Sequence, residues 1–158
     1  MKPYKLPRMS EEEIEMLLDR ERICRITFKG EEFPYLAPFQ YVRIGDALYF
    51  HFTDYGRKMR LLEKDNRVCV GVENLEPDLC EYSFVVLRGE LERIEDTGER
   101  AEAIRRLAEV GRSGLSENFL AAHGFSAEQG WETLSEEKPM VIFKLESFTD
   151  RIGLKSPS

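Results

Sequence analysis

The segment from His51 to Lys58 (HFTDYGRK) combines the residue types that bind a phosphate group. A phosphate dianion is held by backbone N–H groups at the start of a helix, by a hydroxyl group and by one or two cations. Thr53 supplies a hydroxyl, and Gly56 lets the backbone approach closely. Arg57 and Lys58 supply positive charge. The same residues also fit a capped strand end followed by solvated helix charges, so the pattern alone leaves both interpretations open.

A second candidate binding segment lies upstream, where Phe33 to Phe39 (FPYLAPF) has the character of a strand that contains two prolines. Pro38 has no N–H to donate to a β-ladder, which marks an edge or a bulge. An edge strand beside a phosphate-binding turn suits a flat heterocycle, because free backbone groups bond its polar rim and apolar side chains meet its faces. A barrel edge bent by Pro38, without any ligand, fits the pattern equally well.

The positions of cysteine and histidine do not suggest a metal site. Cys24, Cys69 and Cys80 form no Cys-x-x-Cys motif, and we expect reduced, mostly buried thiols. His51 and His123 are far apart in the sequence, and no spacing of His, Cys and carboxylate residues is typical of zinc or non-haem iron. We therefore expect no protein-bound metal.

The overall composition limits the classes of partner. Lys and Arg number 23 against 30 Asp and Glu, so the formal net charge is −7 and the surface repels a phosphodiester backbone. The sequence has no run of about 18 apolar residues, and its N-terminus lacks the apolar stretch of a signal peptide. We expect a cytoplasmic protein without a nucleic-acid or membrane partner, and the 34% of charged residues suggests a thermophilic source.

These candidate binding residues must be positioned by a fold of mostly short strands. The chain is long enough for one domain that spans residues 1–158. A capping box predicts an N-terminal helix over 10–20, and Met59, Leu61 and Leu62 fit a short helix over 55–65. Apolar runs between turn residues predict six strands, at 23–28, 35–43, 47–52, 68–73, 84–94 and 140–148. A helical insertion is expected over 96–138, and a polar tail that frays over 149–158.

The order of these elements favours one fold class. Strands and helices do not alternate, which argues against a parallel doubly wound sheet. We therefore predict a mainly β (α+β) fold, a six-stranded antiparallel β-barrel with peripheral helices. Residues 113–138, within the insertion, are irregular and fit helical turns or a lid.

Several short motifs occur in the order and spacing of a known family. They are Pro34-Tyr35-x-x-Pro38, Leu48-Tyr49-Phe50-His51, Gly56-x-Lys58, Asn66-x-Val68, Tyr82 and Gly89. Together they resemble the FMN-binding split-barrel proteins related to pyridoxamine 5'-phosphate oxidase, above all the nitroimidazole-resistance-like subgroup. The resemblance spans about residues 10–95. It implies a six-stranded split barrel that forms a homodimer with FMN at the subunit interface.

The resemblance also implies roles for individual residues. Those that run along the flavin ring are Ala37, Pro38 and Phe39. Those that hold its phosphate are Thr53, Arg57 and Lys58, with Gly56 in the same turn. His51 lies beside the cofactor, either as a packed support or as a proton donor, and we expect the supporting role. Pyridoxamine phosphate oxidases themselves have a tryptophan after the last strand, which this chain lacks, so oxidation of that vitamin is not implied.

We accordingly expect an FMN-dependent oxidoreductase that passes electrons or a hydride between a nicotinamide-type donor and a small acceptor. One alternative is an FMN-binding or electron-carrying protein without a dedicated substrate. Another is a fold relative that binds haem or a different ligand. Residues 113–138 have no family counterpart, and within them Trp131 fits a core or dimer anchor better than a flavin contact. His123 fits a helix C-terminus better than a proton donor.

Overall fold

The computed structural model describes residues 3–123, 125–134 and 140–157 of the chain. Its α-helices are α1 (Glu11–Arg20), α2 (Arg57–Lys64) and α3 (Thr97–Gly114). Its strands are β1 (Ile23–Phe28), β2 (Tyr35–Ile44), β3 (Ala47–Thr53), β4 (Arg67–Leu75), β5 (Tyr82–Glu90), β6 (Glu92–Arg93), β7 (Met140–Leu145) and β8 (Phe148–Lys155). Short 3₁₀ turns, η1 (Glu117–His123), η2 (Ala127–Gln129) and η3 (Trp131–Thr133), follow α3.

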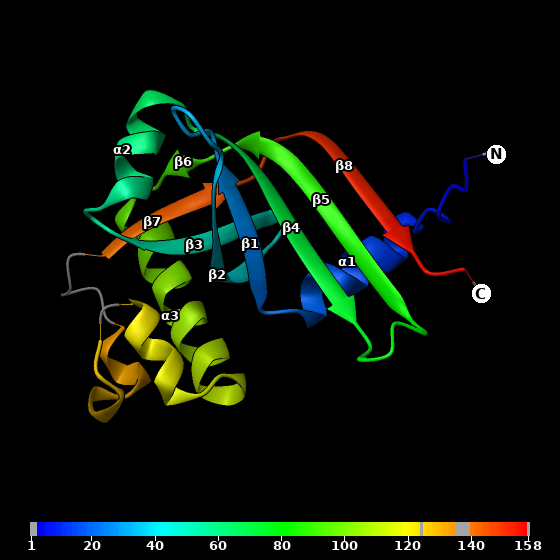
Figure 1. Ribbon diagram of the computed structural model, residues 1–158. Coiled ribbons are helices and arrows are strands. Elements are labelled where there is room, and N and C mark those ends of the chain that lie inside the picture. Colours follow the sequence, from blue (N-terminus) through cyan, green and yellow to red (C-terminus); the bar gives the residue numbers. More distant parts are fainter. Residues whose placement is uncertain (1–2, 124, 135–139, 158) are drawn as a thin grey trace.

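The strands form one antiparallel sheet that curls into a half-barrel (Figure 1). Their order is β6-β7-β3-β2-β1-β4-β5-β8, and every neighbouring pair is antiparallel. In Figure 1, α3 and the 3₁₀ turns lie beside β3 and β7, away from the long ribbon of β4, β5 and β8. The predicted antiparallel barrel with peripheral helices is therefore confirmed.

The strand count differs from the prediction, because the described residues form eight strands rather than six. One of the two extra strands is β6, whose two residues were predicted as part of the strand over 84–94. The other is β8, which occupies most of the predicted tail over 149–158, so the expectation of a fraying tail is wrong. β8 pairs with β5 from Gly89↔Phe148 to Ser83↔Lys155, and Arg8 bridges to Leu154 on its other side. Partners on both edges hold the segment in place, and alternation of Ile152 and Leu154 was the sequence signal for this strand.

β2 changes its neighbour halfway along its length, and this change splits the barrel. Residues 35–40 pair with β1, whereas residues 41–44 pair with β3. Residues 51–53 of β3 pair with β7 on the side away from β2. β2 and β3 therefore separate beyond the Tyr41↔Phe50 pair, and the backbone edges that face each other there are available to other partners.

Apolar side chains form one core inside the half-barrel and another between the sheet and α3. The inner core includes Phe28, Phe50 and Phe52, each with at most 1% of its surface exposed. The outer core joins β2, β3 and β7 to α3, and it contains Trp131, which confirms the interpretation of this residue as a core anchor. Gly111 of α3 makes room for that indole, since a Cβ there would lie 2.2 Å from the Trp131 ring. Across the described residues, no helix has the length and apolar character that a bilayer crossing requires.

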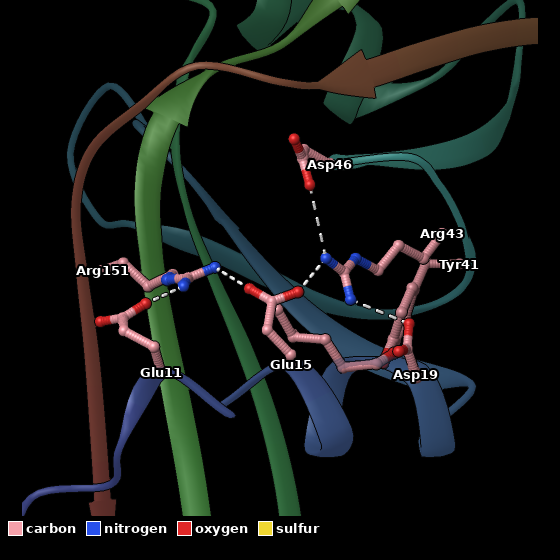
Figure 2. Close-up of polar contacts among 8 residues, drawn as sticks. Glu11, Glu15, Asp19, Tyr41, Arg43, Asp46 and Arg151 are labelled. Carbon is pink, nitrogen blue, oxygen red and sulfur yellow. Dashed lines mark hydrogen bonds and ion pairs between the residues drawn. The ribbon is translucent and has the colours of Figure 1, made fainter. Parts of the chain in front are cut away.

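An ion-pair network attaches α1 to the barrel, as Figure 2 shows. Glu15 lies between two guanidinium groups, those of Arg43 on β2 and Arg151 on β8. Arg43 also binds Asp19 at 2.9 Å, and Arg151 also binds Glu11. The Ser10 cap, whose hydroxyl accepts from the Glu13 N–H, starts this helix as predicted.

Candidate functional site

A narrow pocket, called here the split pocket, lies where β2 and β3 separate. It has a volume of about 40 Å³. Its lining residues are Pro38, Phe39 and Gln40 of β2, His51, Phe52 and Thr53 of β3, Lys58 of α2 and Phe119 of η1. The predicted ring segment and the predicted phosphate segment thus meet in one place. Ala37 does not line this pocket, because it lies one residue further along β2, opposite Ile26 of β1.

Lys58 is the cation of the split pocket. Its ammonium donates to the Thr53 hydroxyl at 3.2 Å and lies 5.9 Å from the centre of the Phe52 ring. Burial lowers the pKa of the Lys58 ammonium, and no carboxylate of the described residues forms an ion pair with it. Gly56, at a φ of 99°, makes the turn that brings β3 into α2 and so places Lys58 beside Thr53.

Arg57 faces a different cavity, although it was predicted to share the phosphate with Lys58. Its guanidinium lies over the Tyr35 ring, 5.7 Å from the ring centre. There it lines a cavity of about 400 Å³ between α2 and the β1–β2 connection, called here the α2 cavity. The structure therefore brings Thr53 and Lys58 together, but it places Arg57 next to them rather than with them.

Two buried polar side chains lie at the split pocket, one from each strand. Gln40 on β2 is 2% exposed and His51 on β3 is 7% exposed, and the described part of the chain buries no other polar residue to this degree. The His51 ring stacks near the Phe125 ring at a centroid distance of 6.5 Å. His51 was predicted, whereas Gln40 was not. A glutamine between Phe39 and Tyr41, in an otherwise apolar run, was the signal that pointed to it.

The Gln40 amide is fixed in one orientation. Its Nε2 donates to the Leu107 carbonyl of α3 at 2.9 Å, and a carbonyl can only accept. Its Oε1 therefore faces away from that carbonyl, and it is buried without a hydrogen-bond partner among the described residues. A buried acceptor without a donor is costly, so this oxygen is placed to accept from a bound group or from an ordered water molecule.

The first of the 3₁₀ turns, η1, forms part of the wall of the split pocket. Phe119 of η1 lines it, and Phe125 follows the same turn. These residues belong to the segment over 113–138 that was expected to form helical turns or a lid. The side chain of His123 and the backbone of residues 135–139 lie outside the described residues.

Cysteine side chains are not part of the split pocket. All three are free, and Cys24 is buried, Cys69 is half-buried and Cys80 is exposed. The expectation of mostly buried thiols is thus wrong for Cys80, which lies in the connection between β4 and β5. Within the described residues, no three His, Cys, Asp or Glu side chains gather as a metal-binding group.

The split pocket suits a small anionic or polar group better than a whole aromatic ring system. Its volume of about 40 Å³ is too small to enclose a whole ring system, so a larger ligand would be only partly inside it. Exposed apolar side chains continue outward from it, including Leu36 on β2, which is 57% exposed, and Tyr55 before α2, which is 71% exposed. A larger ligand would therefore extend along the strand edge over this apolar surface.

Comparisons with known proteins agree with this architecture. A family model described as pyridoxamine 5'-phosphate oxidase matches residues 10–123. A solved FAD-binding protein from Mesorhizobium loti is similar, with a TM-score of 0.72, 18% identity and coverage of 96% of this chain and 99% of that one. No curated protein matches the chain.

Two further solved structures share the fold. A candidate 5-nitroimidazole antibiotic resistance protein from Bacteroides thetaiotaomicron has a TM-score of 0.66 and 21% identity, with coverage of 98% of this chain and 92% of that one. The flavocytochrome Anf3 from Azotobacter vinelandii has a TM-score of 0.68 and 21% identity, with coverage of 96% and 69%. At such identities the likeness concerns the fold.

Proposed function

Because the chain belongs to the pyridoxamine 5'-phosphate oxidase family, we propose that it is a flavoprotein that binds the FMN unit of a flavin at the split between β2 and β3. The similar structures from M. loti and A. vinelandii are an FAD-binding protein and a flavocytochrome, which supports a flavin as the ligand here. A flavin supplies the capacity to take up and release one or two electrons. The chain's own residues bind and orient it.

One observation carries this proposal: a half-buried ammonium without a carboxylate partner. Lys58 loses part of its hydration, and its ammonium donates to the neutral Thr53 hydroxyl. A phosphate would supply the missing negative charge and accept from both groups. The phosphate would also lie at the first turn of α2, where the positive end of the helix dipole favours an anion.

The ring of the flavin is assigned to the edge of β2 that faces the split. Pro38 and Phe39 line the pocket there, and Ala37 continues the same edge. Apolar side chains meet the faces of the ring, and Gln40 Oε1 is an acceptor for a ring N–H. His51 supports this arrangement from β3.

The redox role that fits best is an oxidoreductase that takes electrons or a hydride from a nicotinamide-type donor and gives them to a small acceptor. An electron carrier is the second candidate, because the split pocket, with a volume of about 40 Å³, offers little room for a substrate beside a flavin. Anaerobic reduction by NADH and NADPH, followed by reoxidation with small acceptors, separates these two roles.

Binding of FMN tests the proposal directly. Purified protein mixed with FMN is expected to show flavin absorption and to bind FMN more tightly than riboflavin, which lacks the phosphate. Lys58→Ala should weaken FMN binding by about 1.5–3 kcal/mol, the range for a charged hydrogen bond. Lys5→Ala is the matched control, since Lys5 is exposed in the segment before α1, and Figure 1 shows the N-terminus on the opposite side of the molecule from α2. Equal affinity for FMN and riboflavin would contradict the assignment of the phosphate.

A further inference from the structure

Gln40 lies at the fork where β2 and β3 separate. It is the last residue of β2 that pairs with β1, opposite Ile23, and the next residue, Tyr41, already pairs with Phe50 of β3. Continuing this register by one residue would place Gln40 opposite His51, and both of these side chains line the split pocket. The separation of the strands therefore leaves a buried amide in the wall of the opening.

The oxygen of this amide can act only as a hydrogen-bond acceptor. Nε2 faces the Leu107 carbonyl at 2.9 Å, and turning the amide over would set two acceptors against each other. Oε1 is therefore fixed toward the other side, where it is buried without a hydrogen-bond partner among the described residues. The Gln40 side chain is 2% exposed, so bulk water does not satisfy this oxygen.

A fixed acceptor distinguishes the two redox states of a flavin ring. N5 of the oxidised ring carries no hydrogen and offers Oε1 nothing to accept. When a hydride from the nicotinamide-type donor adds to N5, the donor leaves in its oxidised form, the ring gains two electrons and N5 becomes an N–H donor. N3, in contrast, carries a hydrogen in both states. An acceptor at N5 therefore favours the reduced ring, whereas an acceptor at N3 favours neither state.

The other side chains of the split pocket favour N5 over N3 as the neighbour of Gln40. N3–H lies between two ring carbonyls, and each needs a donor when it is buried, whereas N5 has one carbonyl beside it. Thr53 and Lys58 are assigned to the phosphate, and Pro38 has no N–H. Among the described residues of the lining, the remaining polar side chain is His51, whose imidazole carries a ring N–H. One such donor beside one fixed acceptor matches the N5 edge of the ring.

We propose that Gln40 accepts a hydrogen bond from N5–H of the reduced flavin and thereby raises the reduction potential of the bound cofactor. The proposal rests on the flavin site proposed above and deepens it. α3 contributes through the Leu107 carbonyl, which holds Oε1 in its acceptor orientation. By linkage, the factor by which Gln40 favours binding of the reduced ring is also the factor by which it shifts the redox equilibrium. A tenfold preference corresponds to about 30 mV for a two-electron couple.

Dissociation constants of oxidised and reduced FMN, measured anaerobically for wild type and Gln40→Met, test this assignment. The methionine keeps the length of the side chain but has no amide, so oxidised FMN is expected to bind within about twofold of wild type and reduced FMN about tenfold more weakly. The midpoint potential of the bound flavin should fall by about 30 mV. Asn74→Leu is the control, since it removes a half-buried amide of β4 that donates to Glu21 at 3.2 Å and does not line the split pocket.

Two flavin analogues give the same test in wild-type protein, whether or not Gln40→Met folds. 5-Deaza-FMN has carbon in place of N5, so its reduced form has no N–H there. Its preference for the reduced over the oxidised form is expected to be about tenfold smaller than that of FMN. 3-Methyl-FMN keeps N5 but has no N3–H, and it should show the same preference as FMN.

The outcomes separate this proposal from the flavin site itself. If Gln40→Met weakens both redox forms of FMN equally and 3-methyl-FMN binds poorly to wild type, N3–H lies at Gln40, the proposal is wrong and the flavin site stands. If Gln40→Met changes neither the affinities nor the potential, an ordered water molecule satisfies Oε1 and the proposal is again wrong. If wild type binds no flavin in either redox state, the proposed function fails and the role of Gln40 fails with it.

Discussion

Lys58 carries its charge at a position where water only partly solvates it. Burial lowers the pKa of its ammonium below the ordinary value of 10.5, so the empty site loses this proton more readily than a free lysine does. A bound phosphate stabilises the charged form and therefore raises the pKa again. Binding of the phosphate and protonation of Lys58 are linked.

This linkage predicts how the affinity for FMN depends on pH. The affinity is expected to be constant at neutral pH and to fall as the pH rises through the lowered pKa of Lys58. Because that pKa is below 10.5, the fall begins at a lower pH than it would for an ordinary lysine. Fluorescence titrations of FMN between about pH 7 and pH 10 measure this, with Lys58→Arg as the comparison, because arginine keeps its charge over the whole range. A fall of equal size in wild type and Lys58→Arg would assign the effect to another group.

His51 lies at the split pocket, and its surroundings support a positioning role over proton transfer. It is 7% exposed, belongs to the paired part of β3 opposite Ile142 and stacks near Phe125. His51→Gln is expected to keep FMN bound and to retain most of the rate of flavin reduction by a nicotinamide donor, measured anaerobically by stopped flow. A loss of about a hundredfold with full FMN occupancy would instead indicate general acid–base catalysis.

At the scale of elements, the network around α1 fixes this helix against both β2 and β8 (Figure 2). Burial alone would raise the pKa of the Glu15 carboxyl, but the charges and hydrogen bonds of Arg151 and Arg43 outweigh it and hold the pKa below 4.5. The folded state thus binds fewer protons than the unfolded chain. Glu15 stabilises the fold above pH 4.5 and loses this contribution as the pH falls through its lower folded-state pKa.

Glu15→Gln should therefore reduce the free energy of unfolding by about 1–2 kcal/mol at pH 7, between the values for exposed and buried pairs. The difference from wild type is expected to shrink below pH 4.5. Urea unfolding at several pH values measures both effects. Glu12→Gln is the control, since Glu12 is exposed on the same helix and has no ion pair among the described residues. Equal losses in the two variants would show that the network adds nothing.

The elements that the sequence predicts well are those whose signals are local. The Ser10 capping box and the apolar runs of β1, β3 and β7 depend on residues close together in the chain, and these elements appear near their predicted bounds. β8 was missed because its polar residues suggested a tail, and only its partners on β5 and at Arg8 show why it is ordered. Long-range pairing of this kind is not encoded in a short window.

The candidate site shows the same limit. Pattern and resemblance identified the segments that line the split pocket, but adjacent residues on a helix point in different directions, so Arg57 and Lys58 separate into two cavities. The role of Gln40 could not be predicted, because its amide is oriented by the Leu107 carbonyl of α3, which is 67 residues away in the sequence.

For the whole molecule, the exposed apolar side chains around the split suggest that the folded chain is incomplete as a binding unit. Leu36 lies two residues from Pro38 on the outer side of β2, and Phe33 and Tyr55 lie on neighbouring connections, each more than half exposed. Apolar surface beside a binding site is typical of a subunit contact. A second copy placed there would cover a flavin that the pocket of about 40 Å³ cannot enclose.

We therefore predict a homodimer in which both subunits contact each flavin. Light scattering at micromolar concentration should give about twice the chain mass of 18.4 kDa. Leu36→Glu is expected to produce monomers and to weaken FMN binding at least tenfold, because a charge at that position opposes burial. Leu75→Glu, a comparable exposed leucine at the end of β4, should leave both the mass and the affinity unchanged. A wild-type monomer that binds FMN tightly would show that one chain completes the site by itself.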